Sequence, residues 1–202
     1  MGPYMNTKLV SDLFVQTLFS PRAAADRIMA LSLPREWLWM ALALMSVLNG
    51  IVYSVSLSMG PQSDPQTVQM IPPAFQSPAL FTMFLFGALI VTVMALTWVG
   101  RSLGGAAQIP QVLALIVWMQ VLRLGVQLAL LVLMLALPLG GLALVMIASV
   151  WGLIILVAFI DRAHGFDNIF KSIVVLVLAV LAMVVGLSVI LSVLAAAVMG
   201  GA

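Results

Sequence analysis

The sequence contains no cysteine and very little charge. Without cysteine, disulfides, thiolate metal sites and thiol catalysis are excluded, although the redox compartment is not fixed. Charged residues make up only 7% of the 202 residues, against about 25% in soluble domains. Hydrophobic residues make up 64%, and the mean hydropathy is +1.27. A soluble chain could not cover its surface with so few charges, so an integral membrane protein is predicted.

Sequence motifs for common enzyme classes are also lacking. The chain has no P-loop, no HExxH helix, no GxSxG and no pair of carboxylates inside an apolar run. We therefore expect neither an enzyme nor a proton pump, and no cofactor. The pI near 9.5 rests on a net charge of only +2, so nucleic acid is not an expected partner.

Five long apolar runs are the main feature that is present. Each has about 20 residues or more, enough to cross a hydrocarbon core of ~30 Å as an α-helix. The runs are continuous rather than alternating, which excludes a transmembrane barrel. The fold class expected is an all-α, polytopic membrane helical bundle with five transmembrane helices. The predicted spans are Trp37–Ser58, Ala79–Val99, Gln111–Leu137, Leu139–Ile160 and Ser172–Val198.

Helix-breaking residues separate the spans. Prolines fill the first connection, and Gly104, Gly105 and Pro110 mark the second. The third connection, with Pro138, Gly140 and Gly141, is very short. Spans three and four are therefore expected to form a tight antiparallel hairpin.

The basic residues outside the spans predict the orientation. Four precede the first span, one lies between the second and third, and two lie between the fourth and fifth. The first and third connections and the C-terminal tail contain none. The positive-inside rule then places the N-terminus in the cytoplasm and the C-terminus outside. The seven residues are Lys8, Arg22, Arg27, Arg35, Arg101, Arg162 and Lys171.

The N-terminal segment, residues 1–35, is predicted to be amphipathic and separate from the transmembrane domain, residues 36–202. A first helix has apolar residues on one face, and Ser20 is expected to cap a second helix that begins at Pro21. Two interpretations remain open: interfacial helices on the inner leaflet, or a docking surface for a soluble partner. The apolar residues of the second helix are expected to face membrane or bundle. The apolar residues of the two helices are Leu9, Val10, Leu13, Phe14, Leu18, Ile28, Met29 and Leu31.

Arg123 is the only charged residue inside any predicted span. Gln120 and Gln127 share its helical face at spacings of three and seven residues. An arginine at mid-membrane costs roughly 2.5–3.5 kcal/mol on insertion scales, and no Asp or Glu lies in any span. Asn49 and Tyr53 of the first span are further candidate contacts. Three roles remain open: knitting helices together, binding a lipid headgroup or other anion, and contacting an acidic residue of another subunit.

Two further features carry weaker predictions. His164 is the only histidine, in a connection with Asp161 and Asp167. We expect a solvated loop or an Asp161–His164 pair there, rather than a metal site. Gly100 and Gly104 have GxxxG spacing, but their place at the end of a span favours a turn over a dimer interface.

Three segments resemble the Yip-domain family, five-span membrane proteins named for interacting with Ypt/Rab GTPases. They are FSPRAAADRI before the first span (19–28), GRSLGGAAQIPQVLALIVW leading into the third (100–118), and the stretch from Trp151 to Ile173 with DRAHGFDNIFKSI. The resemblance implies a non-enzymatic membrane protein. The short N-terminal segment is more similar to bacterial members, which implies a bacterial cytoplasmic (inner) membrane.

Two functions are therefore expected. The first is an adaptor or accessory subunit that binds another membrane protein, a second copy of itself or membrane lipids. The second is a small transporter or channel with an anion or lipid-phosphate site at Arg123. A water-filled cavity around Arg123 would favour the transporter, and a dry, packed shell the adaptor.

Overall fold

The computed structural model describes residues 7–59, 77–136 and 138–199, and these residues form helices and no strands. Five helices are long and apolar enough to span a membrane, so the predicted all-α bundle with five transmembrane helices is confirmed. Two shorter helices precede them. The helices are α1 (Thr7–Phe19), α2 (Pro21–Ala30), α3 (Arg35–Met59), α6 (Pro78–Ser102), α7 (Ile109–Ala136), α8 (Pro138–His164) and α9 (Ile169–Met199).

Two helix starts differ from the prediction in detail. Ser20 does precede α2, but its side chain makes no capping hydrogen bond; its carbonyl accepts from Ala24 N at 3.0 Å. The helix α8 begins at Pro138, so Gly140 and Gly141 lie inside it rather than in the connection. Proline suits the first helical position, where its missing N–H would have no intrahelical partner. Leu137, between α7 and α8, lies outside the described residues.

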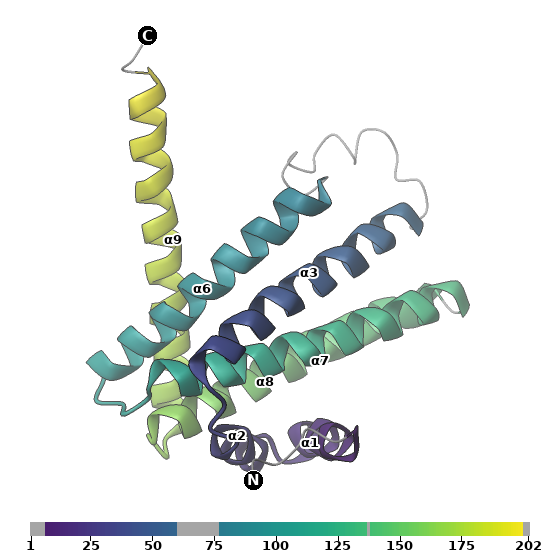
Figure 1. Cartoon of the computed structure of the whole chain (residues 1–202), viewed down its shortest axis with the longest axis horizontal. Coiled ribbons are helices and arrows are strands. Elements are labelled where there is room, and N and C mark those ends of the chain that lie inside the picture. Colours follow the sequence, from purple (N-terminus) through teal and green to yellow (C-terminus); the bar gives the residue numbers. More distant parts are fainter. Residues whose placement is uncertain (1–6, 60–76, 137, 200–202) are drawn as a thin grey trace.

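The five spanning helices converge at one end of the bundle and diverge toward the other (Figure 1). α3 packs between α6 and α7, α8 packs against α7, and α9 contacts α6 and α8. The adjacency of α7 and α8 confirms the predicted hairpin. The best buried apolar residues lie toward the convergent end, among them Leu42, Val93, Leu113 and Phe159.

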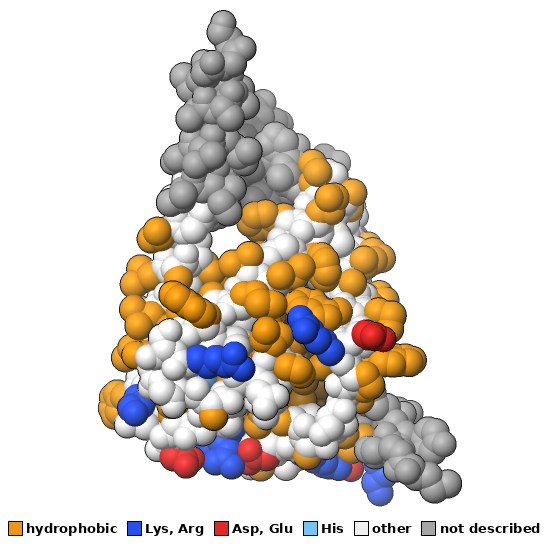
Figure 2. Space-filling model, turned by 60° about the vertical axis from the view of Figure 1, so that its left-hand side comes forward, with side chains coloured by type: hydrophobic (Ala, Val, Ile, Leu, Met, Phe, Trp, Pro, Cys, Tyr) orange, Lys and Arg blue, Asp and Glu red, His pale blue; other side chains and the backbone are white. Residues whose placement is uncertain are grey.

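The convergent end is also where charged side chains gather, and we call it the charged end. It comprises α2, the start of α3, the α6–α7 connection and the α8–α9 connection. Figure 2 shows charged side chains in the lower half of one face and apolar ones above them. Trp37 and Trp98 lie here with 64% and 73% of their surface exposed, as is typical of residues at a membrane–water interface.

The N-terminal helices pack with their apolar faces against the bundle. Leu13 and Ile28 belong to the core cluster, and Leu9, Val10 and Phe14 pack against it. Burying these faces against α7 and α8 removes their apolar surface from water, which stabilises the docked arrangement. We expected the apolar face of α2 to lie against either the membrane or the bundle, and in the structure it lies against the bundle.

Candidate functional site

Three segments far apart in the sequence meet at the charged end. They are α2, the α6–α7 connection and the end of α8 with its connection to α9. α2 packs mainly on α8, and Ala106 N in the α6–α7 connection donates to the His164 carbonyl at 3.1 Å. These are the same three segments that carry the family resemblance, so their meeting defines a candidate site.

Arg162 connects α2 to the α8–α9 connection. Its Nε and Nη2 donate to the two carboxylate oxygens of Asp26 at 3.0 and 2.9 Å, and its Nη1 donates to Asp167 at 3.1 Å. The side chains of Arg162 and Asp26 are 35% and 47% exposed. A two-pronged contact of a guanidinium with a carboxylate fixes orientation as well as distance. Arg162 therefore fastens α2 to the end of α8 in one geometry.

Asp161, the preceding residue, is 1% exposed. One of its carboxylate oxygens accepts from Asn168 N at 2.9 Å and from the Ser172 hydroxyl at 3.3 Å. The other lies 3.0 Å from Arg22 Nη2, an ion pair that lacks hydrogen-bond alignment. The carboxylate thus ties the start of α9 to α8 and pairs with a cation of α2. The expected Asp161–His164 pair is wrong, because Arg22 supplies the opposite charge.

His164 is buried rather than solvated, because α8 continues through it. Its Nδ1 lies 3.0 Å from the Ile160 carbonyl, and a carbonyl only accepts, so Nδ1 carries a proton. Nε2 is buried without a hydrogen-bond partner; the Leu96 carbonyl lies near the ring but outside hydrogen-bond geometry. The ring also stacks on Phe166, with centroids 5.2 Å apart. The expectation of a solvated loop at this residue is therefore wrong.

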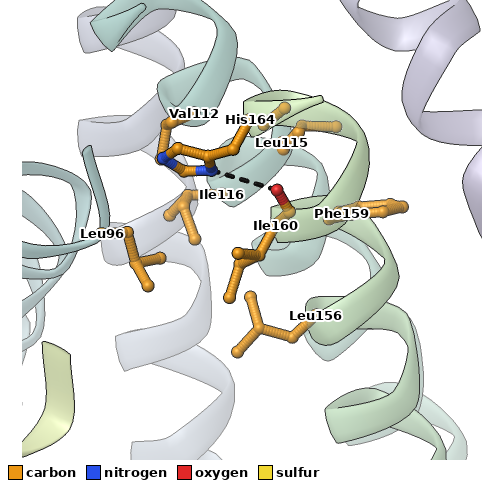
Figure 3. A pocket seen from close by; sticks show the side chains of 9 residues that line it. Leu96, Val112, Leu115, Ile116, Leu156, Phe159, Ile160 and His164 are labelled. Atoms are coloured by element: carbon orange, nitrogen blue, oxygen red, sulfur yellow. Dashed lines mark hydrogen bonds between the residues drawn. The ribbon is translucent and has the colours of Figure 1, made fainter. Parts of the chain in front are cut away.

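The absence of side chains at two glycines makes room for the His164 ring. A Cβ on Gly100 would lie 1.9 Å from Nε2, and one on Gly105 would lie 2.5 Å from Cδ2. The small cavity beside the ring has a volume of about 10 Å³, near the lower limit for one water molecule. Apart from His164, its walls are apolar (Figure 3). The ring is therefore held by the shape of the site around it, and Gly100 serves helix packing. Gly104, at φ +88°, makes the predicted turn.

Two tryptophans fasten α1 to the spans. The Trp118 indole of α7 donates to the Thr17 hydroxyl at 2.9 Å, and the Trp151 indole of α8 donates to the Leu18 carbonyl at 3.1 Å. Thr17 is fully buried, so the first contact is shielded from water. No role was predicted for these two tryptophans. An indole carries one N–H donor that needs an acceptor when it is buried, and for Trp118, which is 6% exposed, this is the signal that could have found the contact.

The predicted polar stripe of α7 faces α3 in part. Asn49 Nδ2 donates to the Met45 carbonyl at 2.7 Å and to the Gln120 carbonyl at 3.3 Å, which links α3 to α7. The side-chain oxygens of Asn49, Gln120 and Gln127 are buried without a hydrogen-bond partner among the described residues. An unmatched buried acceptor costs roughly 1–3 kcal/mol. The stripe therefore holds hydrogen-bonding capacity that the described chain does not use.

Arg123 itself lies exposed on the surface of the bundle. Within the described residues no carboxylate pairs with it and no hydrogen bond to its guanidinium is formed. The Tyr53 ring stacks on Phe81 of α6 with centroids 4.1 Å apart, and no hydrogen bond joins Tyr53 to Arg123 within the described residues. Of the candidate contacts, the structure thus brings Asn49 and Gln120 together and leaves Arg123 turned outward.

The family model described as Yip1 domain matches residues 15–201, which includes all five spans, α2 and the second part of α1. No match was found among curated proteins or among solved structures.

Proposed function

The chain is a membrane protein that belongs to the Yip1 domain family, and we propose that it is a non-enzymatic adaptor. In this proposal it binds an anionic group of another membrane protein, of a second copy or of a membrane lipid, through the outward face of α7. The site residues are Arg123 with Gln120 and Gln127, supported by Asn49 and Tyr53 of α3.

The observation that carries the proposal is the exposed position of Arg123 inside a span. A cation in the hydrocarbon region is stable only with a counter-charge, with water or with a path to the interface. No acidic residue lies in the predicted spans, so a matching charge has to come from outside these spans. A carboxylate or a lipid phosphate fits the planar, two-pronged guanidinium best.

Gln127 adds a second polar group to this face. It is half-buried, follows Arg123 by one turn of α7, and its side-chain oxygen has no hydrogen-bond partner among the described residues. A partner that carries a donor beside its anion would bind both side chains, whereas Asn49 and Gln120 are buried against each other between α3 and α7. The transporter alternative would need a water-filled path at Arg123, and anion flux in proteoliposomes distinguishes it from the adaptor.

We also propose that the charged end faces the cytoplasm, most simply that of a bacterium, with the C-terminus outside the inner membrane. The distribution of the seven basic residues outside the spans supports this orientation. The N-terminal helices then lie on the cytoplasmic side, where their polar faces are accessible to a second, soluble partner.

Native mass spectrometry of the protein in mild detergent tests the Arg123 proposal. Arg123→Met removes the charge and keeps an unbranched stem, and Arg123→Lys keeps the charge without the fork. Val132→Met, on an exposed residue of the same helix, is the matched control. We expect the wild type and the control to retain a phospholipid or a second subunit, Arg123→Met to lose it, and Arg123→Lys to retain it in part.

Two outcomes would count against this function. If all four proteins carry the same lipids and subunits, Arg123 binds neither, and the adaptor site on α7 is refuted. If Arg123→Met loses no ligand but abolishes anion flux in proteoliposomes, the transporter is correct instead. Arg123→Met removes a charge whose place in the hydrocarbon region is costly, so circular dichroism should show that the Arg123→Met protein remains folded.

A further inference from the structure

A second cavity lies at the charged end, away from Arg123. Its volume is about 270 Å³, just below the ~300–1,000 Å³ of small-molecule sites. It is enclosed by α2 and the turn that follows it, by the start of α3 and by the start of α7. The residues that line it are Ile28, Met29, Ser32, Leu33, Leu38, Gln108, Pro110, Gln111 and Ala114.

The lining is divided into an apolar floor and a polar rim. Ile28, Leu38 and Ala114 are at most 9% exposed and form the floor. The three polar residues, Ser32, Gln108 and Gln111, are exposed or half-buried and belong to the rim. No charged side chain lines the cavity. Such a site suits a molecule that carries an apolar group inward and an uncharged hydrogen-bonding group outward.

The rim has hydrogen-bonding groups to offer. The Gln111 side-chain oxygen already accepts from Gln108 N at 2.8 Å, but no hydrogen bond within the described residues uses its amide N–H groups or the Gln108 side chain. The Ser32 hydroxyl makes only a long contact of 3.5 Å with the Ala30 carbonyl. Ser32 also adopts φ +45°, a left-handed conformation that is uncommon for a residue with a side chain. The backbone thus holds Ser32 at the rim at some conformational cost.

The level of the cavity in the membrane indicates the source of the ligand. Leu38 of the floor directly follows Trp37, which is exposed at the charged end as tryptophans are at a membrane–water interface. With the membrane boundary placed at Trp37, the cavity lies at the level where the lipid headgroups meet the acyl chains. The molecules at highest local concentration there are amphiphiles.

We propose that this cavity binds the acyl chain of a membrane amphiphile, with the chain on the floor formed by Ile28, Leu38 and Ala114. The ester or hydroxyl group of the amphiphile then lies at Ser32, Gln108 and Gln111. Part of an acyl chain in the cavity would also cover Leu33, which is 38% exposed and lines the cavity, and removing such apolar surface from water is the driving force for binding. A free fatty acid, a monoacyl lipid and one chain of a bilayer phospholipid share this chemistry.

The test uses the full chain, purified in mild detergent and stripped of lipid, with three probes added separately. These are oleic acid, monooleoyl phosphatidylcholine and dioleoyl phosphatidylcholine. Native mass spectrometry counts the bound molecules, and titration gives the affinity. We expect at least one of the three to bind as one molecule per chain to the Arg123→Met protein, which lacks the proposed anion site on α7, and the probe that binds best identifies the source of the amphiphile.

Two variants close the site in different ways. Ala114→Leu fills the floor, and Met29→Trp narrows the rim; each should weaken binding by about tenfold or more, because several methylene contacts are lost. Ala129→Leu, on an exposed position of the same helix, should bind as the wild type does. If Ala114→Leu fails to fold, Met29→Trp still decides the question.

The proposal is overturned if none of the three probes binds the wild type, or if the folded variants bind as tightly as the wild type. Arg123→Met should leave this binding unchanged, because Arg123 does not line the cavity. The cavity variants and the Arg123 variants therefore distinguish loss of acyl-chain binding in the cavity from loss of ligand binding at Arg123.

Discussion

Gly100→Ala tests how tightly His164 is held between the α6–α7 segment and α8. The added Cβ would lie 1.9 Å from Nε2 of His164, whereas ordinary packed carbons approach to about 3.5–4.0 Å. The ring has little room to move, because Gly105 also packs against it: a Cβ there would lie 2.5 Å from Cδ2 of the same ring. Either α6 moves away from α8, or the ring leaves its site.

Two effects of opposite sign set the expected change in the free energy of unfolding. Alanine is a better helix former than glycine by about 0.5–1 kcal/mol, and overpacking costs about 1–3 kcal/mol. Gly87→Ala is the matched control, since Gly87 lies on the same helix with nothing within 4 Å of the added Cβ. We expect the control to leave the free energy of unfolding level or slightly raised. Gly100→Ala should lower it by about 1–2 kcal/mol.

Unfolding in mixed micelles of a mild and a denaturing detergent, followed by circular dichroism, measures this free energy. A double-mutant cycle with His164→Ala isolates the clash, because Gly100→Ala should cost nothing once the ring is gone. The coupling energy should be about 1–3 kcal/mol. If Gly100→Ala is as stable as Gly87→Ala, or if the cycle shows no coupling, His164 is not held by the two glycines and this reasoning fails.

Three other predictions concern the charged end and the topology. Arg162→Met and Asp26→Asn should each lower the midpoint of thermal unfolding slightly, and less so in high salt, because the pair is partly exposed. An equal decrease at all salt concentrations would argue against an electrostatic role. Trp118→Phe should lower the free energy of unfolding by about 1 kcal/mol, because it removes the hydrogen bond to Thr17 of α1. Unchanged resistance of α1 to proteolysis would contradict this prediction. A cysteine at Gln66, which lies outside the described residues, should react with an impermeant thiol reagent on intact cells, and one at Gly165 should not. Labelling in the opposite sense would reverse the proposed orientation.

The N-terminal helices show why part of the structure could not be predicted. The amphipathic pattern of Leu9, Leu13 and Phe14 indicated a helix with one apolar face, but the same pattern suits a leaflet, a soluble partner or a bundle. The structure decides for the bundle, because Trp118 and Trp151 offer N–H donors to α1. The surface that covers an apolar helix face depends on the neighbouring helices, and the spacing of the apolar residues within that face does not specify those neighbours.

His164 is the clearest case of a local prediction reversed by distant residues. Its neighbours in the sequence, Asp161 and Asp167, suggested a polar loop. Its neighbours in space are Gly100 of α6 and Gly105 of the α6–α7 connection, and Arg22 of α2 pairs with the carboxylate of Asp161. The surroundings of His164 therefore depend on three segments that are far apart in the sequence.

The sequence by itself determined the five spans, the hairpin of α7 and α8, and the position of Arg123 within a span. These follow from hydrophobic length and from the cost of burying charge, which depend on each residue and its near neighbours. Tertiary structure alone decided the contact of Arg162 with Asp26, 136 residues apart, the packing of His164 and the cavity between α2, α3 and α7. Such features depend on the shape and partners of several helices at once, and no local pattern specifies them.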